Sequence, residues 1–346
     1  MAKRDTAIET LRGLAVVLMV CGHVIGATGK VGMEVADDSW WRHFYLMLSP
    51  YRMPLFTTIS GFVYALRPIT RSTAGDFALG KFRRLMLPFL FVSTLVYFAS
   101  WGMGRGLPFS PEHFYKIYYL PFDLFWFLQA IILIFFYVSV AELFDLMKTR
   151  TGWLMSLVAV GIGYLTLPRT TFFSFHSSLY LLPFFVLGLG LHRFGETFRN
   201  WPVRFALVAG FGATLVLFLA RNMFGWTPDI YAERAMFLVA GISGCALVFQ
   251  PRVEVRWLAW MGTYAYGIYL LHILFVAGSR IALQRLTNDT IPDGLVFAIG
   301  LALGLFIPIV IERSVQNMPW IRLLVFGQRS RAVTLPVQAP SPRAAA

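Results

Sequence analysis

Residues 8–28, IETLRGLAVVLMVCGHVIGAT, form an apolar segment long enough to cross a bilayer, yet they include Glu9, Arg12 and His23. An α-helix turns about 100° per residue, so Arg12 and His23 lie within roughly 20° of each other and Glu9 within about 60° of both. Ionisable side chains inside a span are costly and rare, and they usually serve a function. The segment therefore predicts a membrane-spanning helix with one polar stripe that faces other polar groups.

The composition of the whole chain supports a membrane protein. Its 346 residues are 58% hydrophobic and 14% charged, and the mean hydropathy is +0.66. Soluble domains are about 45–50% apolar and about 25% charged. The net charge of +13 is explained by basic residues that flank spans on the cytoplasmic side, so no nucleic-acid partner is expected. Cys21 and Cys245 both fall in predicted spans, and no metal-ligand spacing occurs.

Ten apolar segments are long enough to cross a bilayer, and they predict an all-α, polytopic membrane helical bundle. They are residues 8–28, 45–66, 85–102, 122–142, 152–168, 177–192, 203–220, 234–250, 257–277 and 293–312. Most of the Lys and Arg residues outside these spans lie in the segments that are cytoplasmic if both termini are cytoplasmic. We expect a plasma (inner) membrane domain over residues 1–326 and a disordered cytoplasmic tail over 327–346.

The second span contains SPYRMPLFTTISGF, in which Arg52 and Pro54 come early. Because this span runs inward, Arg52 is expected near the outer side, at the depth of His23, and the two side chains can meet. Pro54 frees a backbone carbonyl, and the hydroxyl groups that follow can line a cavity; they belong to Thr57, Thr58 and Ser60. In the alternative interpretation, Arg52 extends to the outer headgroups.

The connection after the second span is the most basic cytoplasmic segment, with Arg67, Arg71 and the run KFRR. Arginine pairs readily with phosphate oxygens, so a phosphate-rich ligand suits this segment. The alternative is anchoring to anionic lipid, which contributes about 1 kcal/mol per basic residue.

Two further polar residues occur in the last spans. His272, in GTYAYGIYLLHILF, is either a hydrogen-bonded core residue or part of a site. Glu312, at the end of PIVIER, is expected near the depth of Glu9 and Arg12, in a buried ion pair with an arginine. An interfacial cap and an aromatic belt account for Asp123 and Trp126 at the start of the fourth span.

Four stretches resemble the membrane acyltransferase-3 family, whose multi-span enzymes move acyl groups onto extracytoplasmic carbohydrate or related hydroxyl groups. They are ETLRGLAVVLMVCGH, RMPLFTTISGF, the basic run before LMLPF, and GTYAYGIYLLH followed by IER. Together they bracket nearly the whole predicted membrane domain, in the family's order. The chain departs from the pattern in three ways: Glu9 stands where Asp is common, Lys81-x-x-Arg84 replaces Arg-x-x-Arg, and no proline follows IER.

The resemblance implies specific roles for residues of this chain. It implies that His23 is the catalytic histidine and that Arg12 is its partner. From the residues themselves, we expect His23 to act as a general base, with an acyl-histidine intermediate as the alternative, and Arg52 to help stabilise the oxyanion. Glu9, His272 and Glu312 are expected to be supporting polar residues. The donor, acyl-coenzyme A and most simply acetyl-coenzyme A, is a substrate that enters from the cytoplasm. Its phosphates would be held by Arg67, Lys81, Arg83 and Arg84.

The predicted function is therefore O-acyl transfer to a carbohydrate or glycolipid, with no metal, no resident cofactor and no fused hydrolase-like domain. Membrane lipid is the other expected partner. A proton-coupled transporter of a small solute is the main alternative, because carriers also bury Glu, Arg and His. A structural or sensory membrane protein is the third. Dependence on acyl-coenzyme A separates the enzyme from both.

Overall fold

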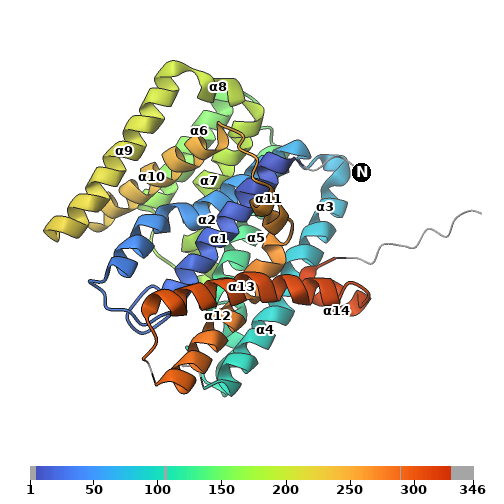
Figure 1. The fold of residues 1–346 in the computed structure, drawn as a ribbon. Coiled ribbons are helices and arrows are strands. Elements are labelled where there is room, and N and C mark those ends of the chain that lie inside the picture. The colour runs from blue at the N-terminus through green and yellow to red at the C-terminus, as the bar shows by residue number, and fades with distance from the viewer. Residues whose placement is uncertain (1–4, 105–106, 289, 329–346) are drawn as a thin grey trace, which may run out of the picture.

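The structure is a computed structural model that describes residues 5–104, 107–288 and 290–328. Those residues form helices and no strands (Figure 1). The α-helices are α1 (Thr6–Ile25), α2 (Trp40–Leu66), α3 (Ala74–Lys81), α4 (Leu87–Gly102), α5 (Trp126–Leu143), α6 (Arg150–Thr166), α7 (Phe175–Arg193), α8 (Gly195–Arg199), α9 (Trp201–Phe224), α10 (Ile230–Phe249), α11 (Arg256–Thr263), α12 (Ala265–Thr287), α13 (Asp293–Ser314) and α14 (Pro319–Phe326). The 3-10 helices are η1 (Arg71–Thr73), η3 (Pro111–Tyr118), η4 (Asp123–Phe125) and η5 (Phe172–Ser174), and η2 (Phe82–Met86) is a short π-helix.

The prediction of an all-α polytopic membrane protein is confirmed. Among the described residues, 8 helical segments are long and apolar enough to span a bilayer. Each of the predicted spans overlaps a helix, although α2 and the 17-residue α6 are outside that set. The number ten and the cytoplasmic termini stay predictions. Most of the predicted tail, residues 329–346, lies outside the described residues.

The predicted span 257–277 differs from the structure, because the chain breaks at Tyr264 into α11 and a longer α12. Glycines explain the break. A Cβ on Gly13 of α1 would lie 1.9 Å from the carbonyl oxygen of Leu258, and one on Gly262 would lie 2.0 Å from that of Glu9. This close backbone contact holds α11 against α1, so α12 must start in a new direction. The predicted span 85–102 is likewise the end of a longer helical run, Arg71–Gly102.

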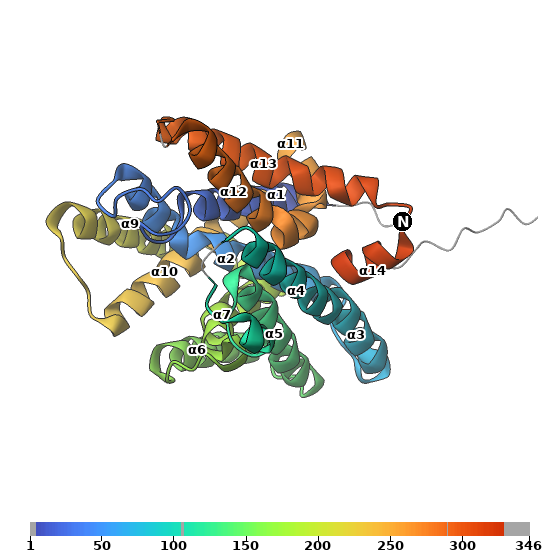
Figure 2. The same cartoon turned by 90° about the horizontal axis from the view of Figure 1, so that it is seen from below.

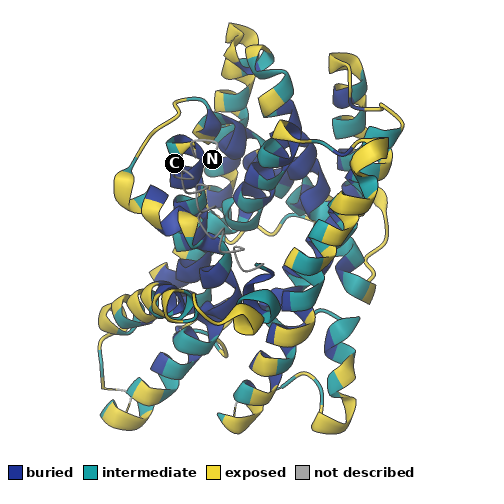
Figure 3. Ribbon diagram, turned by 90° about the vertical axis from the view of Figure 1, so that its right-hand side faces the viewer, coloured by how far each residue is buried: buried dark blue, intermediate teal, exposed yellow. Residues whose placement is uncertain are grey.

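Helices α1, α2 and α7 lie at the centre of the bundle, and α9 and α10 lie at its edge (Figures 1 and 2). Gly61 of α2 and Gly188 of α7 bring these two helices together, since a Cβ on either would lie about 2 Å from a backbone carbonyl oxygen of the other helix. Buried residues are concentrated in this central region, whereas loop ends and peripheral helices are exposed (Figure 3). The exposed apolar side chains of α9 suit contact with lipid.

Helix α1, which carries His23 in its last turn, is capped at both ends. Asp5 caps the start of the helix and accepts a hydrogen bond from the backbone N–H of Ala7 at 3.1 Å. Gly26, with φ +84°, ends the helix in a conformation that favours glycine. Arg42, only 3% exposed, donates to the Gly26 carbonyl and, at 3.2 Å, to that of Val35, so it ties the following loop to α1.

Candidate active site

A cavity of about 390 Å³ lies between α1, α2, α7 and their neighbours. Its lining is rich in polar and aromatic side chains from several helices. They are His23, Tyr45, Ser49, Arg52, Trp126, Tyr164, His176, Ser177, Tyr180 and Tyr269, with Met19, Met53, Leu124 and Phe237 completing the lining. A concave site of this volume, with apolar walls and a few polar groups, is typical of small-molecule binding.

His23 and Arg52 meet at this cavity, which confirms the predicted proximity of these two residues. A Cβ on Gly22 would lie 1.5 Å from Nη1 of Arg52, so the arginine crosses α1 where no side chain obstructs it. The glycine spacing Gly22-x-x-x-Gly26 suggests helix packing in the sequence. The structure gives these glycines other roles, because Gly22 makes room for Arg52 and Gly26 ends α1.

Arg52 has no carboxylate partner within 4 Å among the described residues. Its Nη2 donates to the Ser49 hydroxyl at 2.8 Å, and its guanidinium carbon lies 4.1 Å from the centre of the Tyr45 ring. Its Nε is buried and has no hydrogen-bond partner in the part of the chain that the structure describes. The positive charge is therefore only partly compensated, and it borders an open cavity.

His272 lies directly beside His23 and is completely buried (0% exposed). The two ring centroids are 5.0 Å apart, and the planes are tilted by 56°. The Nδ1 of His272 donates to the backbone carbonyls of Ile268 and Tyr269, both at 2.9 Å. Its Nε2 has no hydrogen-bond partner in the described part of the chain.

Arg12 and Glu9 form an ion pair of 2.8 Å at the other end of α1. Neither residue lines the cavity that contains His23. Arg12 and His23 are separated by 11 residues, or roughly 16 Å along the helix axis. The polar stripe therefore has two separate parts, a paired acid and base at one end and a cavity-lining histidine at the other.

One wall of the cavity is formed by residues that the sequence analysis did not place in a site. They are Tyr164, His176, Ser177 and Tyr180. Trp126, expected in an aromatic belt, also lines the cavity. Spans contain many aromatic and hydroxyl residues, and nothing in their spacing indicates which ones share a cavity. The only sequence signal is the density of polar residues in FHSSLY, at the start of α7.

Left-handed backbone conformations occur next to this wall. Asp123, shortly before Trp126, has φ +44°, and Phe173 and Ser174, shortly before His176, have φ +45° and +52°. Such conformations cost about 1–3 kcal/mol each in residues other than glycine and cluster at functional sites. The Ser174 hydroxyl donates to Gln129 at 2.5 Å, which joins the start of α7 to α5.

The hydroxyl groups expected to line a cavity, those of Thr57, Thr58 and Ser60, are not part of this cavity's lining. Thr57, Thr58 and Ser60 each donate at 2.9 Å to the backbone carbonyl four residues earlier. Among these carbonyls is that of Pro54. A helix in an apolar medium uses such bonds to satisfy its polar groups internally.

The basic residues after α2 lie in two kinds of environment. Arg67, at the end of α2, and Arg84, in η2, are exposed. Lys81 is half-buried, and its Nζ lies 3.4 Å from the ring centre of Phe135 and 5.1 Å from that of Phe77. The cations of this segment therefore do not form one uniform surface.

Arg83 and the backbone of Arg84 join this segment to the end of the described chain. Arg83 Nε donates to the Gly327 carbonyl at 3.3 Å, and the Tyr266 hydroxyl donates to the Arg84 carbonyl. These contacts hold η2 beside α12 and the end of α14.

The prediction that Glu312 forms a buried ion pair with an arginine is wrong, because the described residues include no such pair. Oε1 of Glu312 accepts a hydrogen bond from Gln328 at 3.3 Å, and Gln328 in turn accepts one from Arg322 at 3.0 Å. The Gln328 amide thus connects the Glu312 carboxylate to Arg322. Glu312 borders a second, polar cavity of about 500 Å³, between the Tyr264 break and α14.

These features define a class of protein: a multi-span membrane protein with a polar cavity that combines histidines, an arginine and aromatic residues. A family model described as "Acyltransferase domain" matches residues 5–313. The chain belongs to this membrane acyltransferase-3 family.

Two curated relatives are similar to the chain at lower identity. The nodulation protein NolL of Sinorhizobium fredii is 26% identical over 247 residues, which are 68% of this chain and 61% of the relative. That of Mesorhizobium japonicum is 23% identical over 255 residues, which are 71% of this chain and 63% of the relative. The chain thus spans about three fifths of the length of these relatives. No solved structure matches.

Proposed function

We propose that this protein is a membrane O-acyltransferase that moves an acyl group from acyl-coenzyme A to a hydroxyl group of a carbohydrate or glycolipid. The observation that carries the proposal is the convergence of His23 and Arg52 on one cavity from different helices. A base and a cation that border the same space are the two groups that acyl transfer to a hydroxyl requires. Membership of the acyltransferase family supports the same reaction.

In the proposed mechanism, His23 is neutral at the start and takes the proton of the acceptor hydroxyl. The oxygen forms a bond to the thioester carbonyl carbon, and the carbonyl oxygen becomes an oxyanion near Arg52. The carbon–sulfur bond then breaks, and the proton held by His23 passes to the sulfur, which leaves as coenzyme A thiol. In the rival route His23 carries the acyl group itself. Both routes end with an ester and a free thiol.

The donor would approach from the basic end of the bundle. The exposed Arg67 and Arg84, with Arg83, offer partners for its phosphates. Lys81 would contribute its positive charge without direct contact with the phosphates, because its ammonium group packs against aromatic rings. Arg12, paired with Glu9, lies roughly 16 Å along α1 from His23. The pantetheine chain of the donor, which joins its phosphates to the thioester, would therefore pass Arg12 on the way to the cavity.

The acceptor would bind against the wall formed by Trp126, His176, Ser177 and Tyr180. A sugar ring has an apolar face, which packs on aromatic side chains, and an edge of hydroxyl groups, which needs hydrogen-bond partners. This wall provides both. We propose the plasma (inner) membrane as the location, with the acceptor on its outer side.

The experiment uses the purified full chain in lipid nanodiscs, with acetyl-coenzyme A as the donor and a glycolipid extract of the source cells as the acceptor. We expect thiol release that depends on the extract, together with acetylated glycan detected by mass spectrometry. His23→Ala should lower kcat by about 10²- to 10⁴-fold, as expected for loss of a general base. His192→Ala is the matched control, because His192 lies at the opposite end of α7 from the cavity and should leave activity unchanged.

Two results would contradict the proposal. Undiminished transfer by folded His23→Ala would remove His23 from the reaction. A protein that neither binds nor consumes acetyl-coenzyme A, but moves a solute across the bilayer, would be a transporter.

A further inference from the structure

His272 has a feature that the proposed mechanism does not yet use, a buried nitrogen without a partner. Backbone carbonyls only accept hydrogen bonds, so the Nδ1 that contacts Ile268 and Tyr269 must carry a proton. In the neutral ring Nε2 is then a bare acceptor. It has no hydrogen-bond partner among the described residues, and the side chain is 0% exposed. A buried acceptor without a partner is costly, so such an arrangement calls for a donor.

The group beside His272 that offers a donor is the imidazole of His23, with its ring centroid 5.0 Å away. To act as a base, His23 must present a lone pair to the cavity on one ring nitrogen, and its other nitrogen must then carry the proton. The two rings are adjacent in the structure without a hydrogen bond between them, and a bare Nε2 on His272 is a suitable acceptor for that N–H once a small rotation of the His23 ring brings the two nitrogens together. After proton transfer, the same contact stabilises the His23 imidazolium, which has two N–H groups.

The surroundings hold the two rings in place. On α13, a Cβ at Gly304 would lie 2.7 Å from the Val276 side chain and 2.9 Å from that of Val20, so this backbone packs closely against both α12 and α1. Tyr269, the titratable neighbour on the same helix, donates its hydroxyl to the Leu124 carbonyl at 2.8 Å. Arg52, on α2, lies against Gly22 at the neighbouring position of α1. His272 is thus a fixed ring beside a histidine that borders open space.

We propose that His272 is a positioning residue for His23: it accepts the His23 N–H, fixes the tautomer in which His23 is a base, and stabilises the imidazolium. This inference rests on the proposed function. No covalent step passes through His272, and its own Nδ1 proton stays with the two carbonyls throughout.

The test compares three variants in the nanodisc assay with acetyl-coenzyme A. His272→Phe keeps a buried ring but has no acceptor, and His272→Gln places an amide oxygen near the position of Nε2. Ser279→Ala is the matched control, because Ser279 is another buried polar residue of α12 and bonds only within its helix. Stability is followed by thermal unfolding of each variant.

We expect His272→Phe to lower kcat by about 10- to 100-fold, the effect of one hydrogen bond to a charged group, with KM for acetyl-coenzyme A unchanged. His272→Gln should recover most of this loss, and Ser279→Ala should match the wild type. If the Phe variant does not fold, His272→Leu provides a second acceptor-free side chain. Recovery by Gln is the decisive result, since a purely structural role requires shape and not an acceptor.

Wild-type kcat in folded His272→Phe would overturn the proposal, and so would equal losses in the Phe and Gln variants. These failures differ from failure of the proposed function. If His23→Ala is inactive and His272→Phe is fully active, the acyltransferase mechanism stands and only the positioning role is lost.

Discussion

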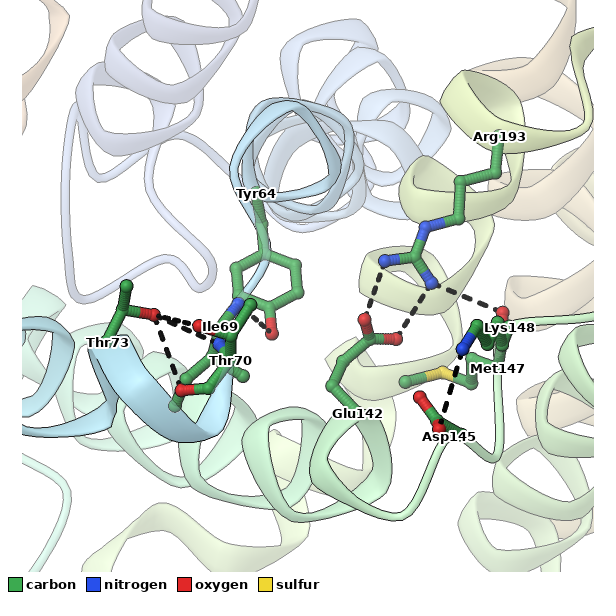
Figure 4. A network of polar contacts seen from close by, with 9 residues as sticks. All are labelled: Tyr64, Ile69, Thr70, Thr73, Glu142, Asp145, Met147, Lys148 and Arg193. Atoms are coloured by element: carbon green, nitrogen blue, oxygen red, sulfur yellow. Dashed lines mark hydrogen bonds and ion pairs between the residues drawn. The ribbon is translucent and has the colours of Figure 1, made fainter.

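Arg52 and Arg193 are arginines of helices α2 and α7, and of the two only Arg193 has a carboxylate partner among the described residues. Arg193 donates from two nitrogens to the two oxygens of Glu142, at 2.9 and 2.6 Å, and also donates to the Met147 carbonyl at 3.2 Å (Figure 4). The side chains are 19% and 8% exposed. Arg52 has instead a serine hydroxyl, a tyrosine ring and an open cavity.

The difference separates a structural cation from one that is available to a ligand. A buried guanidinium is tolerated when its donors are satisfied and its charge is paired, and the Glu142–Arg193 pair meets both conditions. Arg52 meets them only in part, so its charge remains available for negative charge that develops on a substrate. The helix α7 takes part in both regions, with His176 near its start at the cavity and Arg193 at its end in the ion pair.

The largest effect is expected from removing one partner of the ion pair. Glu142→Ala leaves the Arg193 charge buried and unpaired, which should destabilise the protein by about 3–5 kcal/mol. Chemical unfolding in detergent measures the loss, and the protein that remains folded should keep the wild-type kcat. As a control, the double variant Glu142→Leu, Arg193→Leu should regain most of the stability. Similar instability of the single and double variants would show that the pair is not what stabilises this end.

Arg52→Ala should show the reverse pattern. Loss of a charge that stabilises the oxyanion should lower kcat by about 10²- to 10³-fold. Stability should change little, because no carboxylate among the described residues would be left unpaired. Arg52→Lys should have intermediate activity, since lysine retains the charge but not the planar geometry. If Arg52→Ala instead unfolds readily and keeps its kcat, Arg52 is a structural cation like Arg193.

The sequence predicted the helical class, the approximate spans and the approach of Arg52 to His23. Hydropathy and charge sufficed for these, because they depend on the position of each residue along the membrane normal. The aromatic wall could not be predicted in this way. Whether Tyr180 or His176 faces a cavity depends on the rotation of α7. The polar and apolar residues of this helix are not segregated onto opposite faces, so its pattern indicates no preferred face.

Close contacts between backbones were also beyond the sequence. Gly13 and Gly262 allow α11 to cross α1, which breaks the predicted ninth span, yet they resemble the other glycines of the spans. Glu312 shows the same limit for polar partners. Its depth was predicted, but its hydrogen bond to Gln328 depends on how α14 folds back, which no local pattern specifies.

Gly22→Ala tests whether the position of Arg52 is important, without altering its charge. The new Cβ would lie 1.5 Å from Nη1, so the guanidinium must move. A displacement of about 1 Å near a reacting group can cost up to about 100-fold in rate, and we expect a loss of about 10- to 100-fold in kcat. Gly278→Ala on α12 is the matched control, because no atom lies within 4 Å of its Cβ position. Equal activities of the two variants would contradict a positional role for Arg52.

The smallest effect is expected at the basic segment, where the same contrast recurs between Arg84 and Lys81. Arg84 is exposed, so Arg84→Ala should raise KM for acetyl-coenzyme A about fivefold, equivalent to about 1 kcal/mol, with kcat nearly unchanged. The effect should diminish at high salt, because exposed charges are screened. Lys81 packs on Phe135, so Lys81→Ala should lower stability through the lost packing of its chain. Lys148→Ala, at an exposed Lys148–Asp145 pair, is the control and should change neither quantity. An unchanged KM in Arg84→Ala at low salt would remove Arg84 from the donor site and leave it as a lipid anchor.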